Sequence, residues 1–227
     1  MTAKADPSLE SDLCALSGLL AEARRRGFLG RVPPSDHIDH ALGFAEVVGA
    51  PPADLIDLGS GAGLPGLVLA LRWRGARVTL VDSNARRTAL LEEAVARLRI
   101  GGRVQVRTAR AEALGHDMKL RGSASLVTAR AFAKPSATAE CAAGLLAIGG
   151  RLVVSEPPAA SWGAPGTGAG PEPLPGRWPA ALAVLGLWAD APSTARGYGF
   201  QLLVQVEPCP ARYPRRDGVP AKRPLFT

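Results

Sequence analysis

The stretch Asp54-Leu-Ile-Asp-Leu-Gly-Ser-Gly-Ala-Gly-Leu-Pro-Gly66 decides the fold of this chain. Its apolar residues Leu55, Ile56 and Leu58 predict a short, buried strand of a parallel sheet. Glycines follow at once, and Pro65 stands where a helix would begin, a position at which proline costs no hydrogen bond. Such a strand, loop and helix let backbone N–H groups approach a nucleotide-like ligand closely.

Three interpretations of this glycine loop are open when it is considered alone. Gly61-Ala-Gly-Leu-Pro-Gly66 matches the G-x-G-x-x-G fingerprint of dinucleotide-binding folds. Read one frame earlier, Asp57 followed by G-x-G-x-G resembles motif I of class I S-adenosylmethionine (SAM) methyltransferases. A tight turn without a ligand is the third interpretation. The segments that follow the loop are therefore needed to choose among these three interpretations.

The composition is that of a basic protein without metal or membrane signals. Its 227 residues suit one α/β domain with appendages, and the net charge of +7 favours a polyanionic partner such as nucleic acid. Cys14, Cys141 and Cys209 lie too far apart for a metal site or a disulfide framework, so we expect a cytoplasmic protein with no metal. Neither a signal peptide nor a transmembrane run is evident, so we expect no membrane association.

Residues 1–50 are predicted to form a helical extension ahead of the glycine loop. Asp6-Pro7 begins a first helix, and its leucines recur at helical spacing. A second helix is expected from about Asp36 to Val48. His37 and His40 share one face of it, but the sequence offers no third ligand, so we expect a capping or surface role for both rather than a metal site.

The segments after the loop predict a Rossmann-like α/β domain over residues 51–207. Strands are expected at 77–82, 103–107, 124–129 and 151–155, and Asp82 ends the first of these, where NAD and SAM folds both place a carboxylate for the ribose hydroxyls. A Pro/Gly-rich surface loop is predicted over 157–179, followed by two antiparallel edge strands. A mostly parallel seven-stranded sheet that ends in an antiparallel hairpin is the class I methyltransferase order, whereas a dinucleotide fold more often continues with parallel units.

The last segment, residues 208–227, is predicted to be a basic, extended tail. Its prolines are expected to prevent it from forming a helix. Cations of such a tail bind phosphates without regard to sequence, and Tyr213 offers a ring for stacking on a base. We assign RNA binding to five of its side chains: Arg212, Arg215, Arg216, Lys222 and Arg223.

Four blocks of this sequence together resemble the RsmG (GidB) family of small-subunit ribosomal RNA guanine-N7 methyltransferases. The blocks are Asp57–Gly66; Val81-Asp-Ser83 with Arg110-Ala-Glu112; Val127-Thr-Ala-Arg-Ala131; and Tyr213-Pro-Arg-Arg-x-Gly218-x-Pro220-x-Lys222-x-Pro224. The resemblance implies a SAM-dependent enzyme that methylates guanine N7 in 16S ribosomal RNA. It also implies that 16S rRNA or the small ribosomal subunit is the partner; we expect the enzyme to be a monomer.

The resemblance also implies roles for matching residues. Arg130 is the implied catalytic residue, beside the methionine end of SAM. The implied cofactor-binding residues are Gly59, Gly61 and Leu64 around the loop, Asp82 at the ribose, Ala111 and Glu112 at the adenine, and Arg130.

The chain departs from the family pattern on the expected substrate side. Phe28-Leu29-Gly30 stands where the family has Asn-Leu-Thr, and His37-Ile-Asp-His-Ala-Leu42 replaces His-x-x-Asp-Ser-Leu. Ser155-Glu156-Pro157 follows the fifth strand, where the family often has a lysine. Two alternatives therefore stay open: a SAM methyltransferase for a small molecule, and a degenerate homologue that binds SAM or RNA without catalysis.

Overall fold

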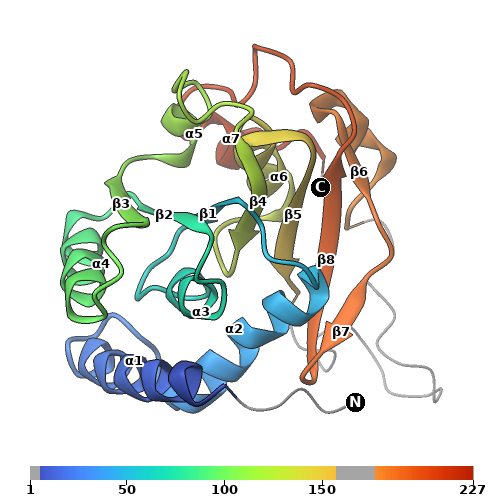
Figure 1. Cartoon of the computed structure of the whole chain (residues 1–227). Helices are drawn as coiled ribbons and strands as arrows, with labels where there is room; N and C mark the ends of the chain where they lie inside the picture. The colour runs from blue at the N-terminus through green and yellow to red at the C-terminus, as the bar shows by residue number, and fades with distance from the viewer. Residues whose placement is uncertain (1–5, 157–176, 227) are drawn as a thin grey trace.

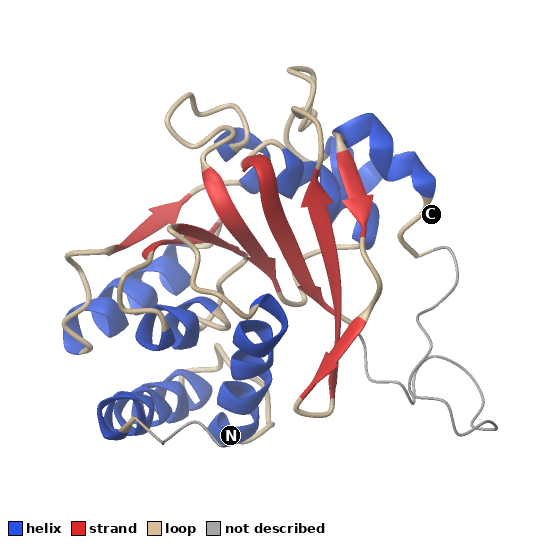
Figure 2. Ribbon diagram, turned by 45° about the vertical axis from the view of Figure 1, so that its right-hand side comes forward, coloured by secondary structure: helices blue, strands red, loops and turns tan. Residues whose placement is uncertain are grey.

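The glycine stretch lies at the centre of a mixed sheet in the computed structural model, which describes residues 6–156 and 177–226. Helices lie on both faces of this sheet (Figures 1 and 2). The strands are β1 (Asp54–Leu58), β2 (Arg77–Asp82), β3 (Val104–Thr108), β4 (Ala124–Ala129), β5 (Leu146–Ser155), β6 (Leu187–Ala189), β7 (Ser193–Ala195) and β8 (Tyr198–Gln205). The helices are α1 (Pro7–Arg25), α2 (Pro34–Val48), α3 (Gly66–Arg72), α4 (Ala85–Arg97), α5 (Ala111–Leu114), α6 (Pro135–Ala143) and α7 (Val219–Lys222), with the 3-10 helix η2 (Ala180–Leu185).

The strand order is β3-β2-β1-β4-β5-β8-β6, which confirms the predicted class I methyltransferase topology. The first five strands of this order are parallel, whereas β8 is antiparallel to both β5 and β6. The sheet has eight strands rather than the seven expected, because β7 pairs with the other end of β8. The turn between them contains Arg196 and Gly197, both at positive φ, which is the backbone that a tight hairpin requires.

The order reverses between β1 and β4, and this reversal positions the site. The chain runs outward from β1 to β3 and then returns to the other side of β1 as β4. In open α/β sheets, ligands bind in the crevice that such a reversal leaves at the carboxyl ends of the strands. The glycine loop after β1 and Arg130 after β4 both lie at this edge.

Two apolar clusters cover the two faces of the sheet. Helices α1 to α4 contribute to one of them, in which Leu20, Phe44, Leu67 and Leu91 are buried. Helix α6 and η2 supply the other, which includes Leu185. The N-terminal residues predicted as an extension therefore share a core with the sheet, and the predicted cap is present, because Asp6 accepts a hydrogen bond from Ser8 N.

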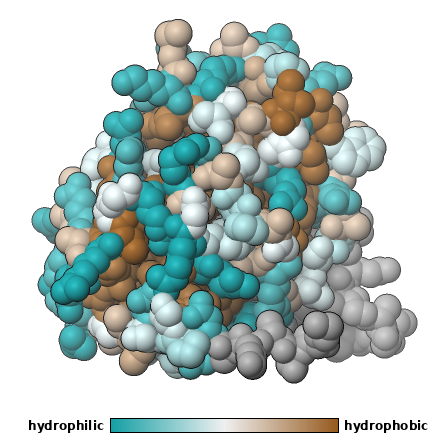
Figure 3. Space-filling model, in the orientation of Figure 1, coloured by the Kyte–Doolittle hydropathy of each residue, from teal (hydrophilic) through white to brown (hydrophobic). Residues whose placement is uncertain are grey.

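Hydrophilic side chains cover much of the face seen in Figure 3, with hydrophobic ones exposed between them. Within the described ranges, no helix is both long enough and apolar enough to span a bilayer.

The C-terminal segment corrects the prediction of an extended tail. It folds back beside α5 and α6 and ends with the short helix α7 (Figure 1). Pro220 lies in the first turn of α7, where a helix needs no N–H donor, so proline does not prevent a helix at this position, contrary to the prediction. Tyr213 is buried at 8% exposure, so its ring is packed inside the protein rather than presented to a base.

Candidate active site

The carboxylate of Asp57 lies at the base of the glycine loop. It is fully buried, and its Oδ1 accepts a hydrogen bond of 2.8 Å from Thr128 Oγ1 on β4. Its Oδ2 accepts one of 3.1 Å from the backbone N–H of Gly66 at the start of α3. Burial raises the pKa of Asp57 to about 6, although hydrogen bonds from Thr128, Ser60 and Gly66 and the charge of Arg130 oppose this rise. One side chain thus joins β1, β4 and α3.

The loop above Asp57 needs its glycines for two separate reasons. Gly59, Gly61 and Gly63 all have positive φ. A Cβ on Gly66 would lie 2.3 Å from a side-chain carbon of Leu80, so no larger residue fits the contact between α3 and β2. A Cβ on Gly59 would lie 2.7 Å from the ring of Phe132, so the absence of a side chain at Gly59 lets this ring pack beside the loop.

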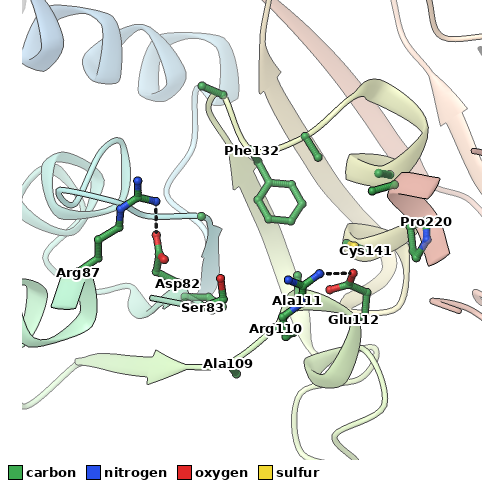
Figure 4. Close-up of a pocket in the computed structure, with 16 residues that line it drawn as sticks. Asp82, Ser83, Arg87, Ala109, Arg110, Ala111, Glu112, Phe132, Cys141 and Pro220 are labelled. Carbon is green, nitrogen blue, oxygen red and sulfur yellow. Dashed lines mark hydrogen bonds and ion pairs between the residues drawn. The ribbon is translucent and has the colours of Figure 1, made fainter. Parts of the chain in front are cut away.

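A cavity of about 300 Å³ extends from Gly59 to the start of α5 (Figure 4). Its lining includes Gly59, Asp82, Ala111, Glu112 and Phe132, so four of the predicted cofactor residues meet in one place. Leu64 instead packs in the apolar cluster under α3. Gly61 acts through its N–H, which donates to Asp82 Oδ2 at 3.0 Å.

Asp82 connects the cavity to the glycine loop. Its Oδ1 accepts a hydrogen bond of 2.9 Å from Asn84 N, and Oδ2 lies 3.5 Å from the guanidinium of Arg87 (Figure 4). Each carboxylate oxygen has two lone pairs, so acceptor capacity remains for the hydroxyls of a ribose. The position of Asp82 matches the sequence prediction.

Glu112 has a partner that the sequence did not indicate. Its Oε1 accepts hydrogen bonds from Arg110 Nη2 at 3.2 Å and from the backbone N–H of Gly218 at 2.9 Å. Burial on its own would raise the pKa of Glu112, but the bonds from Gly218 and Arg110 outweigh it and hold the pKa below the usual value. Glu112, which the sequence assigns to the adenine, is thus bound to the C-terminal segment.

Two buried contacts hold the C-terminal segment beside the cavity. Glu140 of α6 is fully buried and accepts three hydrogen bonds of 2.6–2.9 Å from the backbone and guanidinium of Arg215. Arg121 donates to four backbone carbonyls, including those of Cys209, Pro210 and Tyr213. As a result, Pro220 and Ala221 form part of the cavity wall.

The predicted RNA-binding side chains divide into two groups. Arg212, Arg216, Lys222 and Arg223 are exposed, whereas the guanidinium of Arg215 is engaged by Glu140. Arg212 and Arg216 line an open groove together with His116 and Glu112, so this groove and the cofactor cavity share Glu112.

Arg130 lies at the predicted edge of the sheet but points toward α2. Its Nη2 is 2.5 Å from Nδ1 of His37, and the described residues that line the cavity do not include Arg130. His37 is 8% exposed, so the predicted capping or surface role was wrong. His40 is half-buried and stacks on Tyr198 with ring centroids 4.1 Å apart.

Two of the family departures are accommodated by new contacts. Burial, and next the charge of Arg130, lower the pKa of His40 to about 4, so a neutral ring occupies the place of the family's acid. Glu156, at the place of the family's lysine, accepts a 2.8 Å hydrogen bond from the indole of Trp178. Its Oε2 also lies 2.6 Å from Arg177.

The residues around the cavity fit SAM. Gly59 lines the cavity with backbone alone, Asp82 retains acceptors for the ribose, and Ala111 and Phe132 offer apolar surface to an adenosine. Among the described residues, no three His, Cys, Asp or Glu side chains gather as metal ligands would.

Solved structures with this fold define the class. The chain is similar to an O-methyltransferase from Bacillus cereus in complex with SAH, with a TM-score of 0.57, 16% identity and coverage of 90% of this chain and 93% of that one. A second is an O-methyltransferase family protein from Burkholderia thailandensis, with a TM-score of 0.52, 17% identity, and coverage of 74% and 57%. The fold is that of class I methyltransferases.

The family follows from sequence relatives. A family model described as GidB, rRNA small subunit methyltransferase G, matches residues 35–156. Proteins named ribosomal RNA small subunit methyltransferase G match at 39% identity in Prochlorococcus marinus MIT 9313, covering 77% of this chain and 68% of that protein, and at 30% in Moorella thermoacetica, covering 93% and 88%. The chain belongs to this family of SAM-dependent methyltransferases, as its motifs predicted.

The Glu140–Arg215 pair predicts a large difference between two neighbouring arginines. Arg215→Met leaves the Glu140 carboxylate buried without its partner, so we expect a loss of about 3–5 kcal/mol in the free energy of unfolding. Arg216→Met is the matched control, because Arg216 is exposed, and its effect should stay within about 0.5 kcal/mol. Urea unfolding measures both, and equal stabilities would contradict a structural role for Arg215.

The buried, neutral state of His40 predicts a pH dependence. As the pH falls from 6.5 toward 4, His40 takes up a proton in the unfolded chain but stays neutral in the folded one, so the free energy of unfolding falls. His40→Phe keeps an aromatic ring against Tyr198 without this titration. The stability of the variant relative to wild type should therefore rise over the same pH window in urea unfolding. A constant difference would contradict the prediction.

Proposed function

We propose that this protein transfers the methyl group of SAM to N7 of a guanine in 16S ribosomal RNA. The proposal rests on one observation: in this member of the family, the cavity that fits SAM lies next to a groove lined by exposed arginines. The cavity that fits SAM reaches Glu112, and the groove with Arg212 and Arg216 begins at the same residue. A small-molecule enzyme has no use for the second surface.

The chemistry suits what the site contains. Guanine N7 has a free lone pair, so no general base is needed before it attacks the methyl carbon. The bond from sulfur to that carbon breaks as the bond to N7 forms, and the positive charge passes from the sulfonium to the base. The protein then works by orientation and by exclusion of water, for which about 7–11 kcal/mol is accessible.

The residue roles follow from position. Asp82 accepts hydrogen bonds from the ribose, and Ala111 and Glu112 border the adenine at the other end of the cavity. Arg130 supplies a cation at the carboxyl edge of β4 for the carboxylate of the methionine end. Its buried Nη1 has no hydrogen-bond partner among the described residues and is the donor available to that carboxylate.

The RNA partner is proposed from exposed charge. Arg212, Arg216, Lys222 and Arg223 stand out from the C-terminal segment, and such cations neutralise backbone phosphates at a salt-dependent gain. We assign Arg215 to holding this segment on α6 rather than to RNA. The protein acts in this proposal as a monomer in the cytoplasm, where the small ribosomal subunit is found.

Arg130→Ala tests the site. The variant removes the cation at the methionine end, so methyl transfer from tritiated SAM to small ribosomal subunits should fall at least about a hundredfold. Circular dichroism should show an unchanged fold. The control is Arg99→Ala, because Arg99 follows α4 far from the sheet edge and should leave turnover unchanged. Unchanged turnover in Arg130→Ala would contradict its role.

The proposed substrate is tested by mapping methylated guanines in 16S rRNA from a deletion strain. A single N7-methylguanine should disappear and should return when the gene is restored. If the label from tritiated SAM enters only small molecules of a metabolite extract, the protein is a small-molecule methyltransferase instead. If SAM binds but no RNA is labelled, it is a degenerate, non-catalytic homologue.

A further inference from the structure

The buried contact between His37 and Arg130 points beyond the roles assigned so far. His37 belongs to α2, and Arg130 follows β4, so the contact joins positions 93 residues apart in the chain. It lies outside the described lining of the cofactor cavity. It is also not explained by packing alone, because an arginine that stays charged inside a protein requires specific partners.

The direction of the hydrogen bond is decided by chemistry. A guanidinium has five donors and no acceptor, so Nη2 of Arg130 donates and Nδ1 of His37 accepts over 2.5 Å. An accepting Nδ1 requires a neutral imidazole with its proton on Nε2. Burial, and next the charge of Arg130, lower the pKa of His37 and favour this neutral form.

The bond leaves Arg130 with unused donor capacity. Its Nη1 is buried and has no hydrogen-bond partner among the described residues. Burial lowers the pKa of Arg130, and the charge of the buried Asp57 carboxylate opposes this effect. Among the described residues, the carboxylate of Asp57 accepts from Thr128 and Gly66 and makes no hydrogen bond with the guanidinium of Arg130. A carboxylate group of a ligand is the kind of acceptor that satisfies a buried guanidinium donor well.

We propose that His37 is a positioning residue that holds Arg130 at the carboxyl edge of β4 and thereby sets the affinity for the carboxylate end of the cofactor. This inference rests on the proposed function, because it takes the ligand of Arg130 to be the methionine end of SAM. His37 restricts one end of the guanidinium and leaves Nη1 free to donate. Restricting a binding group before the ligand arrives lowers the entropy cost of binding.

The test separates the carboxylate from the rest of the ligand. S-adenosylhomocysteine (SAH) has the amino-acid end, whereas 5′-methylthioadenosine keeps the adenosine and the sulfur but has no carboxylate. By calorimetry, His37→Leu should weaken SAH binding about tenfold, because it removes a hydrogen bond to a charged group, and should leave methylthioadenosine binding within about twofold of wild type.

Three comparisons control the test. His40→Leu, one helical turn along α2, removes a half-buried histidine that makes no hydrogen bond to Arg130 and should leave SAH binding unchanged. His37→Asn places an amide oxygen at the position of Nδ1 and should restore SAH binding. In an Arg130→Ala background, His37→Leu should have no further effect, which a double-mutant cycle measures.

The pH profile gives a readout that a merely structural role would not change. The groups that face His37 are Arg24 on α1, Asp36 and His40 on α2, and Arg130 after β4. In acid, protonation of His37 removes the acceptor, so SAH binding by wild type should weaken as the pH falls. Because burial lowers the pKa of His37, this loss should begin at a more acidic pH than the ordinary histidine pKa. The amide of His37→Asn does not titrate, so this variant should show a smaller acid loss.

The binding measurements decide whether His37 positions Arg130. It is overturned if His37→Leu binds SAH like wild type, if it loses both ligands equally, or if its loss persists in the Arg130→Ala background. If His37→Leu does not fold, the comparison of pH profiles between wild type and His37→Asn decides, and parallel profiles overturn the proposal. Wild-type protein that binds neither ligand would overturn the proposed function together with this inference.

Discussion

The rest of the structure depends on one buried carboxylate. Asp57 lies at the end of the central strand and accepts hydrogen bonds from β4 through Thr128 and from α3 through Gly66. The glycine loop therefore starts from a fixed point, because its first and last residues are tied to neighbouring strands and helices. The cost of burying this charge raises its pKa to about 6, which shows that the site accepts an energetic penalty for a fixed geometry.

The ends of the chain complete the site that this core begins. The N-terminal part contributes His37, whose partner Arg130 follows β4, and the C-terminal part contributes Gly218, whose partner Glu112 begins α5. Both partners were expected to contact the cofactor. Segments that the sequence divides into an extension, a domain and a tail are therefore coupled through the side chains that line or border one site.

The sequence predicted those features that depend on neighbouring residues. The strand before the glycines, the helix cap at Asp6 and the carboxylate of Asp82 all follow from patterns within a few residues. The fold class follows from the succession of βα units and a final hairpin along the chain. The sequence did not predict contacts between distant polar residues, because nothing in their local pattern marks a partner. Glu140 and Arg215 are 75 residues apart, and a lone glutamate in a helix reads as a surface residue.

The wrong prediction of an extended C-terminal tail shows why composition alone does not predict whether a segment packs on the protein. A run of cations and prolines has the composition of a mobile, solvated tail, yet burial of Tyr213 and the pairing of Arg215 with a fully buried carboxylate hold it on the protein. The remaining exposed cations are thereby kept at a fixed distance from the cofactor cavity. Because Glu112 accepts from Gly218 of the segment and also lines the cavity, one side chain connects the exposed cations with the site that fits the cofactor.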